Sequence, residues 1–352
     1  MLCSAVSLLL ATSASASSSR TRLAFWVEGP VNGGCNGWGM PFPGFSTAAK
    51  VKPSCWNNTL TSITQHAALV DELQLSVGFL VTNASNGLID FDRDGSAYAP
   101  GFREKPLDWL PHWIPDLRAV LKPETKIMVL LHFGGGAFGN STAVASQVYA
   151  NAPALAAQMV DLATTFAWID GYTIDYETYC TDVPREVARL SELFQTLSAA
   201  LHEHGKALNF CTNQNGAGFE HWQYYPSYFD AGVDRLYDMG MYSMYTRTGE
   251  PTDHREQGTS NLLNYPLNNT AFGLGDYRPF DTAAETRAWL DELLRRSRGR
   301  PGQLTLHVYD LFGAKPALPG HDCATNRTEF DHHCVRPPVS WWPALEHFHS
   351  SQ

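Results

Sequence analysis

Three carboxylates lie close together in residues 168–177, WIDGYTIDYE, a run that is otherwise mostly apolar. They are Asp170, Asp175 and Glu177, and the run has the composition and flanks of a buried β-strand. Side chains alternate between the two faces of a strand, so Thr173, Asp175 and Glu177 should point the same way. The sequence therefore predicts two carboxylates on one face, with Glu177 at the carboxyl end of the strand.

This spacing suits general acid catalysis. Neighbouring positions on one face of a strand are about 6.5–7 Å apart, and at that range an ionised Asp175 raises the pKa of Glu177 and helps to keep it protonated. The bulky Tyr172, Ile174 and Tyr176 point the other way, where they can pack against helices. Because buried carboxylates are unfavourable unless they are partnered or functional, we predict that Glu177 is a catalytic acid.

The alternative is that these carboxylates form structural salt bridges inside the fold. The cations of the neighbouring strands are Lys126, Lys206 and Arg235. All three stand at the start of their strands, away from the carboxyl ends where Glu177 is placed, and this favours the catalytic reading.

The strand that carries these residues belongs to a regular alternation of short apolar runs and longer amphipathic runs. Strict alternation implies parallel strands with helical crossovers, and eight of them in this length favour a closed (β/α)8 barrel in a single domain. The predicted strands are 23–29, 75–83, 126–136, 168–177, 207–213, 235–245, 271–277 and 303–313. The predicted helices are 62–74, 107–122, 153–167, 184–205, 221–232, 282–299 and 340–349. In such barrels the active site lies at the carboxyl ends of the strands.

Residues 1–18 have an apolar core and small residues typical of a secretory signal peptide, which leaves 19–352 as the barrel domain. Five N-x-[ST] sequons and six cysteines outside the leader agree with an exported, secreted protein that carries glycans and disulfides. A pairing of neighbours in sequence is the guess among fifteen connectivities. The sequons are at Asn57, Asn83, Asn140, Asn268 and Asn326, and the guessed pairs are Cys35–Cys55, Cys180–Cys211 and Cys323–Cys334.

The composition narrows the class of ligand. A formal net charge of -10 argues against nucleic acid or an anionic membrane as the main partner. No apolar segment approaches the roughly 20 residues of a membrane helix. The glycines at 134–136 lack the spacing of a dinucleotide fingerprint, and G-x-S-x-G is absent. We expect no cofactor, an oligosaccharide or polysaccharide substrate, and a monomer.

The run DGYTIDYE, residues 170–177, resembles the D-G-x-D-x-D-x-E signature of glycoside hydrolase family 18, which belongs on the fourth barrel strand. The family comprises chitinases and endo-β-N-acetylglucosaminidases, and also inactive chitin-binding lectins. Its S-x-G-G motif on strand three resembles His132 to Gly135 here, without the serine, and includes Gly134. Its tyrosine near the end of strand six corresponds to Tyr242, with Tyr245 as an alternative register.

The resemblance implies a substrate-assisted retaining mechanism. Glu177 would protonate the glycosidic oxygen, and the 2-acetamido oxygen of the substrate would attack the anomeric carbon. Asp175 would orient the acetamide and stabilise its developing positive charge, while Tyr242 would donate a hydrogen bond to the acetamide oxygen. The links cleaved would be β-1,4 bonds next to N-acetylglucosamine, in chitin or in an N-glycan core.

Two departures from the family pattern affect this expectation. Thr173 replaces the middle aspartate of the signature, and a threonine hydroxyl can donate a hydrogen bond but cannot share charge. Strand eight has Tyr309 where the family usually supplies a tryptophan as the floor for the sugar. Both changes favour an alternative function, a lectin that binds such glycans without cleaving them. A third reading is a barrel glycosidase of another specificity.

Further candidates for substrate binding stand at other strand ends. Trp26 and Glu28 end the first strand, Asn213 ends the fifth, and Asp238 lies in the sixth with its side chain expected to face inward. Glu28 is equally suited to a structural pair. The stretch 321–334 holds histidines and cysteines, but its spacing matches no standard zinc pattern, so we expect a disulfide there and no metal site.

Overall fold

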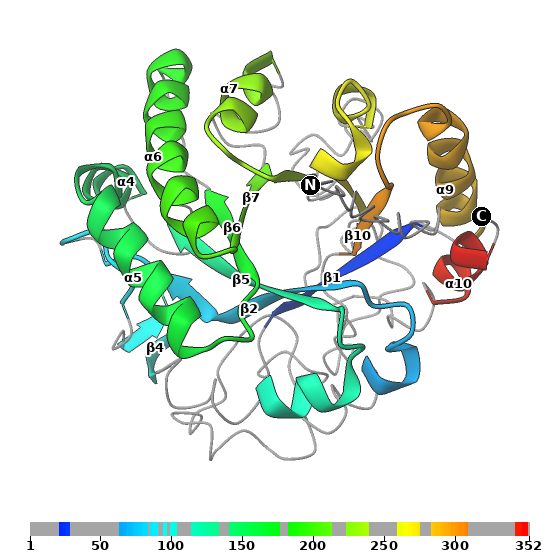
Figure 1. The fold of residues 1–352 in the computed structure, drawn as a ribbon, viewed down its shortest axis with the longest axis horizontal. Coiled ribbons are helices and arrows are strands. Elements are labelled where there is room, and N and C mark those ends of the chain that lie inside the picture. Colours follow the sequence, from blue (N-terminus) through cyan, green and yellow to red (C-terminus); the bar gives the residue numbers. More distant parts are fainter. Residues whose placement is uncertain are drawn as a thin grey trace, which may run out of the picture.

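Eight parallel strands close into a barrel, and helices surround it (Figure 1). The order of the strands around the barrel is β1-β10-β9-β8-β7-β6-β5-β2, as predicted for a single (β/α)8 domain. The computed structural model describes residues 21–28, 63–83, 85–90, 94–96, 99–103, 114–133, 141–176, 182–212, 223–238, 259–274, 283–308 and 342–350. At several strand ends it describes the backbone but not the side chains.

All eight predicted strands are present, and most of them begin within three residues of the predicted position. They are β1 (Arg22–Glu28), β2 (Glu72–Val81), β5 (Lys126–Phe133), β6 (Gly171–Tyr176), β7 (Ala207–Thr212), β8 (Arg235–Asp238), β9 (Thr270–Leu274) and β10 (Thr305–Val308). Counted along the barrel, β6 is the fourth strand, which is where the predicted signature belongs.

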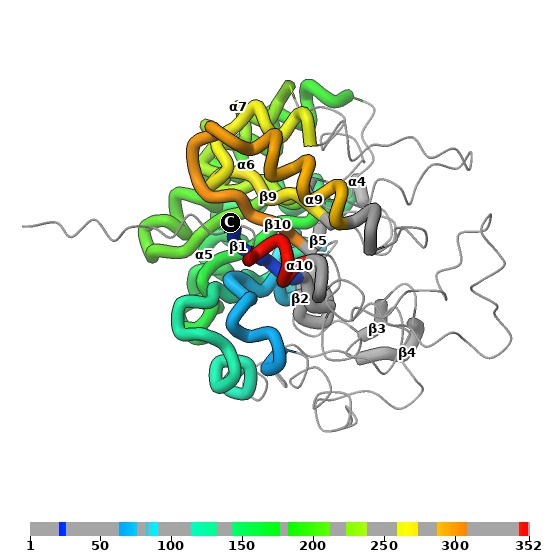
Figure 2. Tube along the Cα trace, turned by 90° about the vertical axis from the view of Figure 1, so that its right-hand side faces the viewer, coloured from blue at the N-terminus to red at the C-terminus, as the bar shows by residue number. Residues whose placement is uncertain are grey.

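The helices also follow the predicted alternation. Those with complete bounds are α4 (Ser141–Ala150), α5 (Ala152–Thr165), α6 (Val183–Glu203), α7 (Tyr225–Asp230), α9 (Ala283–Ser297) and α10 (Trp342–Ser350), with a short 3-10 turn η5 (Leu267–Asn269) before β9. Residues 114–120, within the predicted helix 107–122, and residues 259–262 are also helical. Figure 2 shows α9 and α10 side by side, as they are in Figure 1. Helix α4 and the hairpin of β3 (Asp94–Ser96) and β4 (Ala99–Arg103) had no counterpart in the prediction.

One predicted helix is wrong over half of its length. The range 62–74 was assigned to a helix, but helical residues end at position 66 and β2 already begins at Glu72. The apolar residues Ile63, Val70 and Leu73 are all buried and mimic a helical repeat. Their burial comes from a short helical turn followed by a strand, so periodicity alone could not separate the two.

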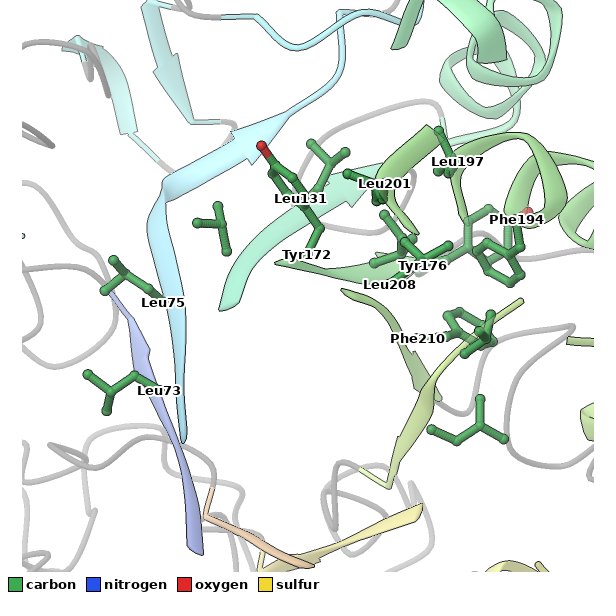
Figure 3. Packing of buried hydrophobic residues seen from close by; sticks show 14 of the residues in the cluster. Leu73, Leu75, Leu131, Tyr172, Tyr176, Phe194, Leu197, Leu201, Leu208 and Phe210 are labelled. Atoms are coloured by element: carbon green, nitrogen blue, oxygen red, sulfur yellow. The ribbon is translucent and has the colours of Figure 1, made fainter. Parts of the chain in front are cut away.

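The apolar layer between the strands and the helices holds most of the core. Leu73, Tyr172, Leu208 and Phe210 point outward from their strands and pack against the helical ring (Figure 3). The residues that alternate with these along each strand point into the barrel. Figure 3 shows this layer on the helix side of the strands, with the labelled Phe194, Leu197 and Leu201 contributed by α6.

Helix α6 shows why the sequence folds this way locally. Its buried residues recur every three or four positions, which forms a single apolar stripe against the barrel. Asp182 caps the first turn by accepting a hydrogen bond from the Arg185 amide, and Pro184 lies in that turn. Gly205, just beyond the helix end, has a φ of 67°, which a glycine adopts without strain.

Three aspartates fasten the amino-terminal end of the barrel in the same way. Asp71, Asp170 and Asp234 each stand just before a strand and accept a hydrogen bond from a backbone amide of the preceding barrel strand, at 2.8 to 2.9 Å. Each also pairs with a basic side chain from a helix or loop: Lys122, Arg118 and His202, respectively. Each contact holds one pair of neighbouring strands in register: β1 with β2, β5 with β6, and β7 with β8.

Candidate functional site

Strand β6 carries its polar and apolar residues on opposite faces, as the sequence predicted. Thr173 is fully buried and Asp175 is 3 % exposed, and neither belongs to the apolar layer on the outside. Tyr172, Ile174 and Tyr176 point outward, where the Tyr172 hydroxyl donates a hydrogen bond to the Met159 carbonyl at 2.7 Å. Thr173 and Asp175 therefore face the barrel interior.

Glu177 directly follows Tyr176, the last residue of β6, and it lies outside the described residues. The sequence predicts that Glu177 shares the inner face with Thr173 and Asp175, and this placement stays a prediction. Its role as the catalytic acid stays a prediction.

Asp170 belongs to the barrel floor and not to the site. One of its carboxylate oxygens accepts hydrogen bonds from Arg118 at 2.9 Å and from the Ile127 amide at 2.8 Å. Arg118 also donates to the carbonyl groups of Thr125 and Trp168. This first acidic residue of the signature therefore holds the beginning of β6 against β5.

Gly171 is required by lack of space inside the barrel. A Cβ atom at this position would lie 2.3 Å from the Ala207 carbonyl oxygen and 2.7 Å from the end of the Met128 side chain. The register pairs Gly171 with both of these residues on the two neighbouring strands. A glycine here allows β5, β6 and β7 to approach closely below Thr173.

A chain of buried polar groups runs from Thr173 across the barrel. The Thr173 hydroxyl donates to Gln74 Oε1, and Gln74 Nε2 donates to Glu72 Oε1 and to the Tyr237 hydroxyl. The Tyr237 hydroxyl in turn donates to Glu72. Arg235 completes the chain with a hydrogen bond from its Nη1 to Glu72 Oε2 at 3.0 Å.

The chain crosses the barrel because β2 and β8 lie on opposite sides of it. Glu72 is 2 % exposed and also has the Arg22 guanidinium 3.5 Å away. Burial alone would lower the pKa of Arg235, but Tyr237 and Glu72 outweigh it and hold this pKa above its ordinary value. Burial raises the pKa of Tyr237, and the Glu72 charge raises it further.

Sequence reasoning missed this chain for a definite reason. Glu72 and Gln74 had been placed at the end of a helix, where polar residues need no partner across the fold. Arg235 had been recognised only as a cation at a strand start. The signal that could have revealed the chain was the pattern E-x-Q in a run that continues as an apolar strand, because such residues must face an interior.

A second polar cluster lies on the outer face of the same strand. The hydroxyl groups of Tyr176 and Tyr149 both donate to Glu186 Oε1, and they lie 3.4 Å from each other. Burial, then the neighbouring Tyr176 and Glu186, raise the pKa of Tyr149 well above its ordinary value. The cluster joins the end of β6 to α4 and α6, one residue before Glu177.

The other predicted site residues are described only in part. Trp26 and Glu28 lie in β1, in register with Gln74 and Ser76 of β2, but their side chains are outside the description. Within β8 the inward position belongs to Tyr237, and the side chain of Asp238, the next residue, is not described. The remaining candidates lie outside the described residues: Gly134, Gly135, Asn213, Tyr242 and Tyr309.

Two searches of the described residues bear on other functions. No group of three or more His, Cys, Asp or Glu within the described part of the chain could hold a metal ion. The stretch 321–334 lies outside that part. Over the same described residues, no helix combines the length and the apolar character needed to cross a membrane.

Comparison with known proteins gives matches of structure only. No family model matches the sequence, and no curated protein matches it. A class V chitinase from Pseudomonas fluorescens Pf-5 is similar over 93% of this chain and 98% of its own, with a TM-score of 0.57 and 13% identity. A glycoside hydrolase family 18 N-acetylglucosaminidase from Paenibacillus barengoltzii covers 89% and 99%, with a TM-score of 0.51 and 12% identity.

A third structure is a mutant class V chitinase from Nicotiana tobaccum, which was solved in complex with NAG4. It covers 90% of this chain and 99% of its own, with a TM-score of 0.54 and 11% identity. These matches span nearly the whole barrel, and in this barrel residues Gly171–Tyr176 of the run DGYTIDYE form the fourth strand, with Asp175 buried on its inner face. The chain therefore has the fold of the glycoside hydrolase family 18 chitinases and N-acetylglucosaminidases, as its resemblance to that family implies.

Proposed function

We propose that this protein is a glycoside hydrolase that cleaves β-1,4 links next to N-acetylglucosamine. The observation that carries the proposal is the inner face of β6. Asp175 is buried there, two residues after Thr173 and on the same face of the strand. A buried carboxylate on the fourth strand of such a barrel, next to its carboxyl end, is where this fold places catalytic groups. The likeness to chitinases of the same fold supports it.

The proposed mechanism is substrate-assisted and retains the anomeric configuration. Glu177 gives its proton to the glycosidic oxygen as the bond to the anomeric carbon breaks. The acetamido oxygen of the same sugar bonds to that carbon and forms an oxazolinium ion, whose positive charge Asp175 stabilises. Glu177 then takes a proton from a water molecule whose oxygen bonds to the anomeric carbon, the bond from that carbon to the acetamido oxygen breaks, and the oxazolinium ring opens with the acid regenerated. Tyr242 would hydrogen-bond the acetamide oxygen.

The substrate class follows from this chemistry, because only a sugar with a 2-acetamido group can supply the nucleophile. Chitin and the N-glycan core both meet the requirement. The complex of the Nicotiana tobaccum chitinase with NAG4 supports an oligosaccharide of this class. The partner of the protein is thus a glycan substrate.

One assay tests the proposal. The protein and its Glu177→Gln variant are incubated with chitooligosaccharides and with a high-mannose glycopeptide, and the products are separated by mass. Cleavage by the wild type that Glu177→Gln abolishes is the expected result. Glu203→Gln, at an exposed position of α6, is the matched control and should cleave as the wild type does. Cleavage that survives Glu177→Gln would overturn the assigned acid.

A second function, glycan binding without cleavage, is favoured by one observation. Thr173 replaces the middle aspartate of the signature, and its hydroxyl donates away from Asp175, to Gln74. A lectin would bind the same oligosaccharides in a titration and leave them intact. If the protein neither binds nor cleaves these oligosaccharides, that result would point to a barrel glycosidase of another specificity.

We also propose that the protein is secreted, with residues 1–18 as its leader and the barrel as its mature part. Among the described sequons, Asn268 is exposed, while Asn83 is half-buried and accepts hydrogen bonds from the Ser85 amide and hydroxyl. Asn268 is therefore the better acceptor of a glycan. Expression in a secreting eukaryotic cell, followed by glycosidase treatment and mass analysis of wild type and Asn268→Gln, tests both points. Cysteine pairing stays a prediction, since Cys211 is the one cysteine within the described residues.

A further inference from the structure

A series of buried hydrogen bonds runs from Thr173 through Gln74 and Glu72 to Arg235. The chemistry of these groups fixes which of them donates and which accepts in each bond. Glu72 faces two guanidinium groups, those of Arg235 at 3.0 Å and Arg22 at 3.5 Å. An ionised carboxylate only accepts hydrogen bonds, so the side of the Gln74 amide that faces it must be the NH2 group. The carbonyl oxygen of Gln74 then faces Thr173, whose hydroxyl can only donate to it.

This direction determines what Thr173 presents to Asp175. A threonine hydroxyl has one proton, and here that proton is used by Gln74. Toward the next inward position of β6, Thr173 can therefore offer only acceptor lone pairs. Glu72 is two hydrogen bonds away from Thr173, yet it sets the position of the Thr173 proton.

We infer that Glu72 is a positioning residue for Thr173, the inward neighbour of Asp175 on β6, and that it carries, on β2, the carboxylate that would otherwise stand at position 173 of β6. The register supports this exchange of place. Thr173 lies level with Asn209, and Asn209 lies level with Arg235 on the next strand. A carboxylate at 173 would thus share the layer of the buried cation that Glu72 now neutralises.

The inference predicts that only one of the two positions accepts a carboxylate. Thr173→Asp adds a second buried acid beside Gln74, whose amide cannot turn its NH2 group toward both. A second buried carboxylate that is repelled by Glu72 and faces the carbonyl oxygen of Gln74 should lower the melting temperature by about 5 °C or more. Glu72→Gln removes the partner of Arg235 and should lower it by a similar amount. Thr173→Asp combined with Glu72→Gln restores one carboxylate, and Gln74 can then turn its NH2 group toward position 173.

The experiment is therefore a double-mutant cycle on the full chain, read by thermal unfolding. The double variant should melt above both single variants and recover more than half of the larger loss. The matched control replaces Glu72→Gln by Glu186→Gln, which removes a buried carboxylate on the other face of β6. Thr173→Asp with Glu186→Gln should show additive losses and no recovery.

For its effect on catalysis, the inference rests on the proposed function. Glu72→Gln should lower kcat on the cleaved oligosaccharide about tenfold with little change in KM, and the double variant should have the higher kcat of the two. The inference is overturned if Thr173→Asp alone is as stable as the wild type. It is also overturned if the double variant does not melt above both single variants, recovers no more than half of the larger loss, or fails to fold. A wild type without activity would refute the proposed function and leave the melting cycle to decide this inference.

Discussion

At the scale of single residues, Asp175 shows what burial demands of a carboxylate. It is 3 % exposed on the inner face of β6, and an ionised group in such a place needs a compensating environment. In the proposed reaction, the oxazolinium ion supplies part of that environment by bringing a positive charge beside it. Because this attraction is stronger in the transition state than with the neutral substrate, it accelerates the chemical step.

The first prediction concerns Asp175→Asn, which keeps the volume of the side chain and removes its charge. We expect kcat to fall by about 10²-fold or more, since a fixed group that stabilises developing charge contributes on that order. Oligosaccharide binding, measured by calorimetry, should weaken far less. Asp161→Asn, at an exposed position of α5, is the control and should leave both quantities unchanged. An unchanged kcat in Asp175→Asn would remove this residue from the mechanism.

The second prediction concerns Gly171→Ala. The added methyl group would lie 2.3 Å from the Ala207 carbonyl oxygen, which is backbone and cannot move aside alone. We expect the free energy of unfolding to fall by about 1–3 kcal/mol, as overpacked cores do. Gly205→Ala is the comparison, because nothing lies within 4 Å of its Cβ position and only its φ of 67° is unfavourable. Chemical denaturation should rank Gly171→Ala as the more destabilising change, and the reverse order would contradict the close approach of the strands.

At the scale of elements, β6 is held from both sides. Its inner face is bonded through Thr173 to β2, and its outer face is bonded through Tyr176 to α6 and α4. The two attachments lie three residues apart, at Thr173 and Tyr176, in the strand segment that leads to Glu177. A short strand end that bears a reacting group benefits from such support, because small displacements of that group reduce the rate strongly.

The third prediction separates this support from simple stabilisation. Tyr176→Phe and Tyr149→Phe each remove one hydroxyl donor from Glu186. Both should lower the free energy of unfolding by about 1–3 kcal/mol, the effect of a lost bond to a buried charged group. Only Tyr176→Phe, which alters the residue next to Glu177, should also lower kcat severalfold without raising KM. Equal kcat values in the two variants would show that the cluster only stabilises the fold.

The elements themselves were largely predictable from the sequence. Alternating apolar runs predicted all eight barrel strands, because parallel strands buried on both faces are mostly apolar even where, as in β6, a few polar residues face the interior. The helix predicted at 62–74 failed because Ile63, Val70 and Leu73 are spaced like a helical stripe while they belong to different elements. The two faces of β6 were predictable from alternation alone. The crossing from Glu72 to Arg235 was not, because it joins residues 163 positions apart that only the closed barrel brings together.

At the scale of the whole molecule, several tyrosine hydroxyl groups lie inside the barrel or in the layer between its strands and helices. Three tyrosines have a pKa raised well above the ordinary value: the partly buried Tyr149 between α4 and α6, and the buried Tyr172 behind β6 and Tyr237 inside the barrel. Burial is the leading cause in all three. In an unfolded chain each of them would lose its proton near the ordinary value of 10.0.

The fourth prediction follows from the sign of these shifts. Above pH of about 10 the unfolded chain releases these protons while the folded chain keeps them, so the unfolded state binds fewer protons and stability falls as pH rises. Each tyrosine should contribute a decline of up to about 1.4 kcal/mol per pH unit, whereas below pH of about 10 its contribution is constant. Denaturant unfolding at a series of alkaline pH values, with tyrosinate absorbance as a second signal, measures the slope. Tyr172→Phe removes one such group, whose hydroxyl bonds only the Met159 carbonyl, and should make the decline shallower. A slope that Tyr172→Phe leaves unchanged would mean that Tyr172 ionises at the same pH in the folded and unfolded chain, against its position behind β6.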